Sequence, residues 1–154
     1  MTEEEITCAE LARAMALAST TAHRRVLAHL FTLRPEPCPE TLPHLVRWLD
    51  DADEHVARDA ADGLGLLLAS IRSPQRLAAA QLAAGGPLFR YAQDHAVPFV
   101  LAALAVTAHQ PARAYLQGLA ADGARPLLQE SAVTALRSFD WYASPHHAGQ
   151  TPPR

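Results

Sequence analysis

The chain has 154 residues, enough for one folded domain with a sizeable core. Alanine, with 32 residues, and leucine, with 22, make up more than a third of the sequence, which favours helices and argues against a β-rich fold. All 13 basic residues are arginine, and the formal net charge of −3 disfavours general electrostatic binding to nucleic acid or to anionic lipid.

The N-terminus, the hydropathy and the cysteines indicate the cellular setting. The first five residues include three glutamates, whereas a secretory signal begins with a basic segment, so we expect a cytoplasmic protein. The longest apolar stretch, 96–106, is too short to span a bilayer, and we expect no membrane partner. Cys8 and Cys38 have neither CxxC nor metal-ligand spacing, which predicts neither a disulfide framework nor a structural zinc site.

Two helices are predicted in the first third of the chain. Thr2 and Glu5 have the spacing of a capping box, which predicts a helix over 3–18. The polar residues 19–21 offer an N-cap for a second helix, whose apolar residues recur at helical spacing. This helix is expected to end at the proline-rich segment 34–39, which is predicted to be a stiff loop.

The segment 41–69 has an order of residues that is more specific than helical periodicity. A proline and spaced leucines come first, an acidic turn follows, and a helix rich in small residues ends in Leu-Gly. The positions concerned are Pro43, Leu45, Leu49, Asp50, Val56, Ala60, Ala61, Leu64 and Gly65. This segment resembles a HEAT repeat, a unit of an A helix and a B helix that stacks on its neighbours. The resemblance implies close packing at Gly65 and further units along the chain.

The later part of the chain carries a weaker copy of this pattern over 111–138. After an acidic turn at Asp122, the positions Leu128, Ala132, Val133, Ala135 and Leu136 repeat the spacing of Val56, Ala60, Ala61, Gly63 and Leu64. Between the two copies we expect a helix over 74–84, a turn at 85–87, a short amphipathic piece over 88–91, and an apolar helix after Asp94.

These elements predict an all-α fold, a short right-handed α-solenoid of antiparallel helix pairs with seven or eight helices. One HEAT-like domain is expected over 1–142. The polar, proline-containing residues 143–154 are predicted to form a disordered tail. The aromatic residues Phe139, Trp141 and Tyr142 either cover the end of the last helix pair or anchor a partner.

HEAT-like solenoids expose their B helices on the concave face, so the resemblance implies a binding surface there. Arg58 and Asp62 also have the spacing of an i,i+4 ion pair. We call the outward-facing residues of the two matching B helices the B-helix strip, and predict that it contacts a partner: His55, Arg58, Asp59, Asp62, Glu130, Thr134 and Arg137.

No catalytic, cofactor-binding or metal-binding residue is predicted. The eight histidines lack a spacing such as HExxH, and no nucleophile motif such as Gly-x-Ser-x-Gly occurs. We therefore expect no cofactor and a non-catalytic module that binds another protein, such as a bacterial immunity or antitoxin protein or a regulatory adaptor.

Two other classes stay open, both implied by the HEAT resemblance: a nucleic-acid-binding protein or base-excision glycosylase, and a lyase or scaffold that handles a prosthetic group. The mixed charges of the B-helix strip disfavour nucleic acid. The identity of the protein partner and the oligomeric state also stay open, and the solenoid ends offer a surface through which two copies could associate.

Overall fold

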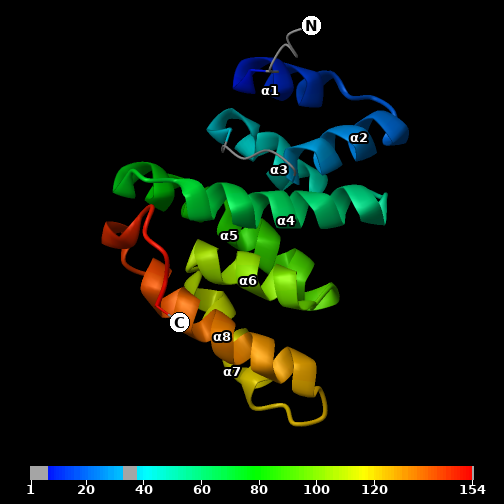
Figure 1. Cartoon of the computed structure of the whole chain (residues 1–154). Coiled ribbons are helices and arrows are strands. Elements are labelled where there is room, and N and C mark those ends of the chain that lie inside the picture. The colour runs from blue at the N-terminus through cyan, green and yellow to red at the C-terminus, as the bar shows by residue number, and fades with distance from the viewer. Residues whose placement is uncertain (1–6, 33–37, 154) are drawn as a thin grey trace, which may run out of the picture.

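The computed structural model of the chain describes residues 7–32 and 38–153, and these ranges contain eight α-helices, two short 3₁₀ helices and no strand (Figure 1). The prediction of an all-α protein is confirmed. The α-helices are α1 (Cys8–Leu17), α2 (Thr21–Thr32), α3 (Leu42–Trp48), α4 (Glu54–Ser70), α5 (Pro74–Asp94), α6 (Pro98–Thr107), α7 (Gln110–Ala120) and α8 (Pro126–Tyr142). The 3₁₀ helices are η1 (Pro39–Thr41) and η2 (Pro145–His147).

The even-numbered helices contact one another in chain order. α2 packs on α4, α4 on α6 and α6 on α8, and α3, α5 and α7 each contact the even-numbered helix that follows them. Figure 1 shows the helices following one another from α1 at one end of the molecule to α7 and α8 at the other, with α4 across the middle. The buried apolar residues between Leu11 and Tyr142 form one core cluster.

α4 illustrates how the sequence produces this packing. Asp53 has an extended backbone just before the helix, and its carboxylate accepts a hydrogen bond from the Val56 N–H at 3.1 Å, which caps the helix. Val56, Ala60 and Leu64, three apolar positions of the repeat pattern, are fully buried. The aspartate cap therefore sets the start of α4, and the periodic apolar residues set its buried side.

Close approach of α4 to α6 depends on a residue without a side chain. A Cβ atom added at Gly65 would lie 2.8 Å from Ala103 Cβ and 3.1 Å from Ala103 Cα. The close packing expected at Gly65 is therefore present, and the residue it meets is in α6.

Two ion pairs connect α2 to the acidic turn before α4. Arg24 Nε lies 2.7 Å from Asp51 Oδ2, and Arg25 Nε lies 2.9 Å from Asp53 Oδ2. The hydrogen bond from Arg25 is the main cause that lowers the pKa of Asp53 to about 2. Because this pKa lies below that of the unfolded carboxyl, the pair stabilises the fold above about pH 4, and this contribution is lost as the pH falls toward 2.

α1 begins later than predicted. The observed capping box joins Thr7 and Glu10: the Thr7 N–H donates to Glu10 Oε2 at 2.8 Å, and the Glu10 N–H donates to Thr7 Oγ1 at 3.2 Å. Thr7 has an extended backbone, so the prediction of helix at this residue is wrong. Thr2 and Glu5, the predicted capping pair, lie outside the described residues.

The predicted turn at 85–87 is wrong, because α5 runs through it as one helix of 21 residues with Pro87 in its interior. A proline in this position removes one backbone hydrogen bond. Ala84 and Leu88, on either side, are fully buried, and an added Cβ at Gly85 would lie 2.9 Å from His109 Cβ. Tertiary packing on this segment therefore overrides the local turn signal.

The C-terminal part departs from the predicted register of the second repeat unit. Ala132 and Ala135 are buried as expected, but Val133 is 40% exposed, whereas its expected counterpart Ala61 is buried. Val133 therefore lies on a side of α8 that is open to solvent.

The aromatic residues at the end of α8 take part in packing. Phe139 and Tyr142 belong to the core, and the Trp141 ring stacks on His147 with centroids 3.6 Å apart. η2, from the segment predicted to be a disordered tail, contacts both α5 and α8. The arrangement favours end-covering over partner contact for Phe139 and Tyr142, while disorder of residues 143–154 in solution stays a prediction.

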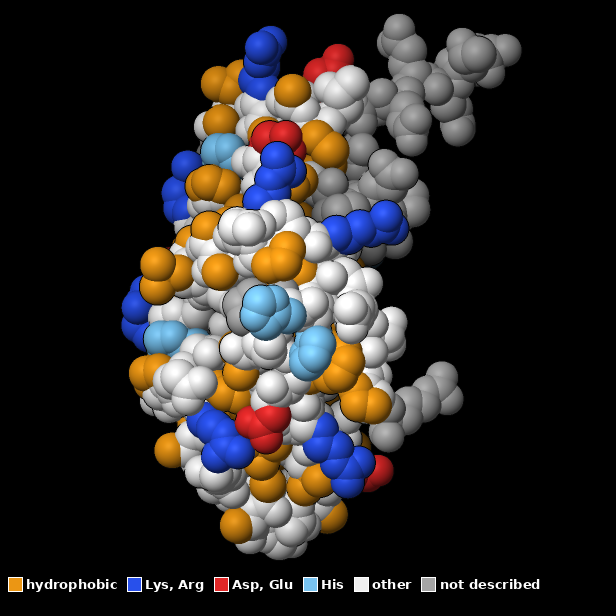
Figure 2. Space-filling model, turned by 90° about the vertical axis from the view of Figure 1, so that its left-hand side faces the viewer, with side chains coloured by type: hydrophobic (Ala, Val, Ile, Leu, Met, Phe, Trp, Pro, Cys, Tyr) orange, Lys and Arg blue, Asp and Glu red, His pale blue; other side chains and the backbone are white. Residues whose placement is uncertain are grey.

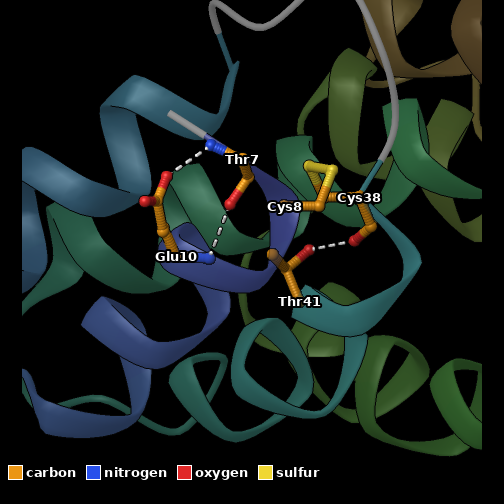
Figure 3. Close-up of a disulfide and its surroundings, with 5 residues drawn as sticks. All are labelled: Thr7, Cys8, Glu10, Cys38 and Thr41. Carbon is orange, nitrogen blue, oxygen red and sulfur yellow. Dashed lines mark hydrogen bonds between the residues drawn. A yellow bond between two sulfur atoms is a disulfide. The ribbon is translucent and has the colours of Figure 1, made fainter. Parts of the chain in front are cut away.

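A disulfide joins Cys8 to Cys38, so the prediction that the cysteines form no such bond is wrong (Figure 3). The two residues are 30 positions apart in sequence, yet folding places their Cα atoms 5.2 Å apart. Thr41 Oγ1 donates a hydrogen bond to the Cys38 carbonyl at 2.6 Å. The disulfide thereby links α1 to Cys38, the residue before η1, and η1 leads directly into α3.

We predict that replacing both cysteines, Cys8→Ser with Cys38→Ser, lowers the free energy of unfolding by about 2–4 kcal/mol, since the bond restricts the unfolded chain. Urea denaturation with and without reductant measures the effect. The wild type should lose stability with reductant, while the double variant should be insensitive to it. Equal stability of all four samples would contradict a structural role for the bond.

A pair of glycine substitutions tests the close packing of α4. Gly65→Ala should destabilise the protein by about 1–3 kcal/mol, because the new methyl group meets the backbone of Ala103. Gly118→Ala is the matched control: it lies within α7 with nothing within 4 Å of the added Cβ, and should stabilise by about 0.5–1 kcal/mol. Thermal denaturation measures the change in stability of each variant. Changes of the same sign in the two variants would contradict the close packing at Gly65.

Candidate functional site

Four residues of the B-helix strip line one surface pocket. His55, Arg58, Asp59 and Asp62 occupy successive turns of α4 and face outward between α2 and α6, the two helices that flank α4. His29 from α2 and Phe99 from α6 complete a lining around a volume of about 440 Å³. We call this the α4 pocket.

The other three strip residues lie elsewhere. Glu130, Thr134 and Arg137 are exposed on α8 and are not part of the lining of the α4 pocket. The structure therefore brings together the α4 half of the predicted strip and leaves the α8 half as a separate stretch of surface.

Arg58 interacts with an aromatic ring rather than with the predicted acid. Its guanidinium carbon lies 5.4 Å from the centre of the Phe99 ring, a distance typical of a cation–π contact. No Arg58–Asp62 ion pair occurs among the described residues, so the predicted i,i+4 pair is wrong. Because the ring of Phe99 belongs to α6, the helix sequence alone could not show this competing contact.

Asp59 faces the histidine contributed by α2. His29 Nδ1 lies 3.8 Å from Asp59 Oδ2, and the two groups form an ion pair when the imidazole is protonated. The Asp59 side chain is 28% exposed, so this interaction is open to solvent and ions.

Asp62 is the third charged side chain that α4 contributes to the pocket. Partial burial raises the pKa of its carboxyl, the negative charge of Asp59 raises it further, and Arg58 opposes the shift. Within the described part of the chain, no hydrogen bond or ion pair reaches its carboxylate. The ionised form is consequently disfavoured in the folded protein relative to the unfolded chain.

Sequence reasoning missed the two residues from neighbouring helices. Phe99 lies in an apolar stretch that predicts a buried helix, yet the residue is only partly buried and its ring faces Arg58. His29 follows the helical pattern of α2 without a motif that marks it. Finding either residue requires knowledge of which helices lie beside α4.

The described residues contain no group of three or more histidine, cysteine, aspartate or glutamate side chains placed to hold a metal ion. Among the helices in these ranges, none is both long enough and apolar enough to cross a membrane. The residues that line the α4 pocket provide charged groups, hydrogen-bonding groups and one aromatic ring for contact with a partner.

Comparisons of this chain with protein-family models, with curated proteins and with solved structures give no match.

We predict that Asp62→Asn raises the melting temperature at pH 7. The carboxyl has a raised pKa in the folded state, so its ionised form destabilises the fold at neutral pH and this penalty disappears below the unfolded pKa of about 3.8. Calorimetry at pH 7 and pH 3 should show a gain at the higher pH only. Glu130→Gln, at an exposed acid of α8, is the control and should show no gain at either pH. A loss of stability in Asp62→Asn at pH 7 would contradict the assignment.

Proposed function

We propose that this chain is a non-catalytic module that binds another protein through the α4 pocket. The single observation that carries the proposal is the partly buried Asp62 carboxylate in the α4 pocket, which is repelled by Asp59 and makes no hydrogen bond or salt bridge among the described residues. A basic side chain of a partner, placed against Asp62, would reduce this repulsion and gain a charge-assisted hydrogen bond.

The rest of the pocket supports recognition of a mixed-charge surface. Arg58 lies over the Phe99 ring, and its guanidinium would donate hydrogen bonds to an acid of the partner. His55 is exposed at the rim. Complementary charges of this kind fix the orientation of a complex and speed its formation more than they raise its affinity.

We further propose that the architecture is a short right-handed solenoid of antiparallel, HEAT-like helix pairs. Its support is the chain of contacts α2, α4, α6 and α8, together with the tight approach at Gly65 and the ion pairs from Arg24 and Arg25 to the turn before α4. In such a solenoid the α4 pocket belongs to the binding face.

A bacterial immunity or antitoxin protein, or a regulatory adaptor, is the class that we favour within this proposal, acting in the cytoplasm. In the cytoplasm the Cys8–Cys38 bond would be transient or redox-sensing, because disulfides in the cytosol are commonly of these kinds. Trapping of free thiols in intact cells shows whether Cys8 and Cys38 are reduced in part of the protein, as a transient bond requires, or are always oxidised.

A photo-crosslinking experiment tests the binding site. The crosslinking amino acid p-benzoylphenylalanine replaces His55 in one variant and Leu82 in another, since Leu82 is highly exposed on α5 and outside the pocket. We expect one protein to be captured from position 55 and not from position 82. Adding Asp62→Arg or Arg58→Glu should reduce capture about tenfold or more.

The same species captured equally from both positions, or capture unchanged by both charge reversals, would remove the α4 pocket from consideration. In the same crosslinking assay, Glu130→Arg shows whether α8 also belongs to the surface that contacts the partner. A salt-dependent shift of duplex DNA at micromolar protein would instead favour the nucleic-acid alternative, and visible absorbance that co-purifies with the protein would favour the prosthetic-group alternative.

A further inference from the structure

A second, larger hollow lies between the η1–α3 segment and the corner where α4 ends and α5 begins. Its volume is about 700 Å³, within the usual range of small-molecule sites, and it shares no lining residue with the α4 pocket. Its lining includes the apolar side chains of Leu42, Leu67, Ile71, Ala79 and Ala80. We call it the corner groove.

The corner groove carries two arginines on one wall and one acid on the other. Arg72 and Arg76 come from the α4–α5 corner and the first turn of α5, and Glu40 comes from η1. No ion pair involves either arginine in the part of the chain that the structure describes. The charged side chains of the lining thus sum to one net positive charge.

The hydroxyl groups of the groove are already engaged within the protein. Ser70 Oγ donates to the Leu67 carbonyl at 2.7 Å, and Ser73 Oγ donates to Gln75 Oε1 at 3.2 Å while it caps α5. The guanidinium groups of Arg72 and Arg76 are therefore the donors that the groove offers to a ligand.

From these features we propose that the corner groove binds a small amphipathic carboxylate. The apolar body would cover Leu67 and Ile71, which are buried residues of the lining, and the carboxylate would meet Arg72 and Arg76. The planar guanidinium matches a carboxylate with two parallel hydrogen bonds. This site goes beyond the proposed protein-binding function and does not depend on it.

Both walls of the groove are held in place by other parts of the chain. Gly149, with φ of +77°, lies so close to Arg72 that an added Cβ would be 2.9 Å from Arg72 Cγ, so the C-terminal segment supports the stem of this arginine. On the opposite wall, the Cys8–Cys38 bond holds η1. Walls that are fixed before binding reduce the entropy cost of taking up a ligand.

The chemistry of the lining favours a small molecule over the carboxyl terminus of a peptide. A bound peptide needs partners for its backbone N–H and C=O groups. The lining of the groove is largely apolar and its serine hydroxyls donate elsewhere, whereas a hydrocarbon tail makes no such demand.

The side that bears the groove has no extended surface of one chemical kind. Figure 2 views the molecule from the side at which α4 ends and α5 begins, and arginine, acidic, histidine and apolar side chains lie scattered among one another on this face. A localised ligand therefore fits this side better than a broad apolar or cationic partner surface does.

Isothermal titration calorimetry of the oxidised, full-length protein tests the proposal, with decanoate as the probe and decylamine as the charge-reversed comparison. We expect decanoate to bind at one site and decylamine to bind at least tenfold more weakly. Arg76→Gln should weaken decanoate binding about tenfold, which corresponds to the loss of one charged hydrogen bond. Arg90→Gln is the matched control, because Arg90 is exposed on the same helix and outside the groove.

A second variant fills the groove directly. Ala79 is an exposed lining residue, so Ala79→Trp should leave the helical circular dichroism unchanged and abolish decanoate binding. Absence of decanoate binding to the wild type, or equal affinities for decanoate and decylamine, would overturn the proposal. So would unchanged binding in both Arg76→Gln and Ala79→Trp, or binding of a short peptide with a C-terminal leucine in place of decanoate.

Discussion

The close approach of α4 to its neighbours is the constraint on which the rest of the structure depends. α4 contacts α2, α3, α5 and α6, and at Gly65 it has no room for even one methyl group. Small and aliphatic residues occupy the sides of α4 that meet other helices, so its longer polar side chains lie on the side left open. The α4 pocket is a consequence of this division, because tight packing brings His29 and Phe99 within reach of Arg58 and Asp59.

The sequence was most informative where local signals and tertiary packing agree. In α4 the repeating apolar and small residues indicate one helix with one buried side, and Val56, Ala60 and Leu64 are fully buried in the structure. At Gly85-Gly86-Pro87 the local signal indicates a turn, whereas burial of the flanking residues keeps α5 continuous. The Cys8–Cys38 bond could not be predicted, because nothing in the spacing of two cysteines reports how the chain returns on itself.

Only the part of the candidate site that lies on α4 could be predicted from the sequence. Periodicity placed His55, Arg58, Asp59 and Asp62 on one side of α4, and the structure gathers these four in a pocket. Their partners depend on neighbouring helices: Arg58 meets Phe99, and the burial of Asp62 follows from packing that no local pattern contains. The corner groove was not predicted at all, since its walls come from segments about 30 residues apart, which become neighbours only in the folded chain.

The disulfide also changes what a protease can do to this protein. The connection between α1 and α2 is exposed at Ser19 and Thr20, the kind of place where nicking begins. A cut there would leave α1 covalently attached through Cys8 to Cys38, so the fragment would stay at a high local concentration beside its own docking position. The nicked molecule would keep the mass of the intact chain plus one water, and would release its N-terminal helix only after a thiol opened the bond.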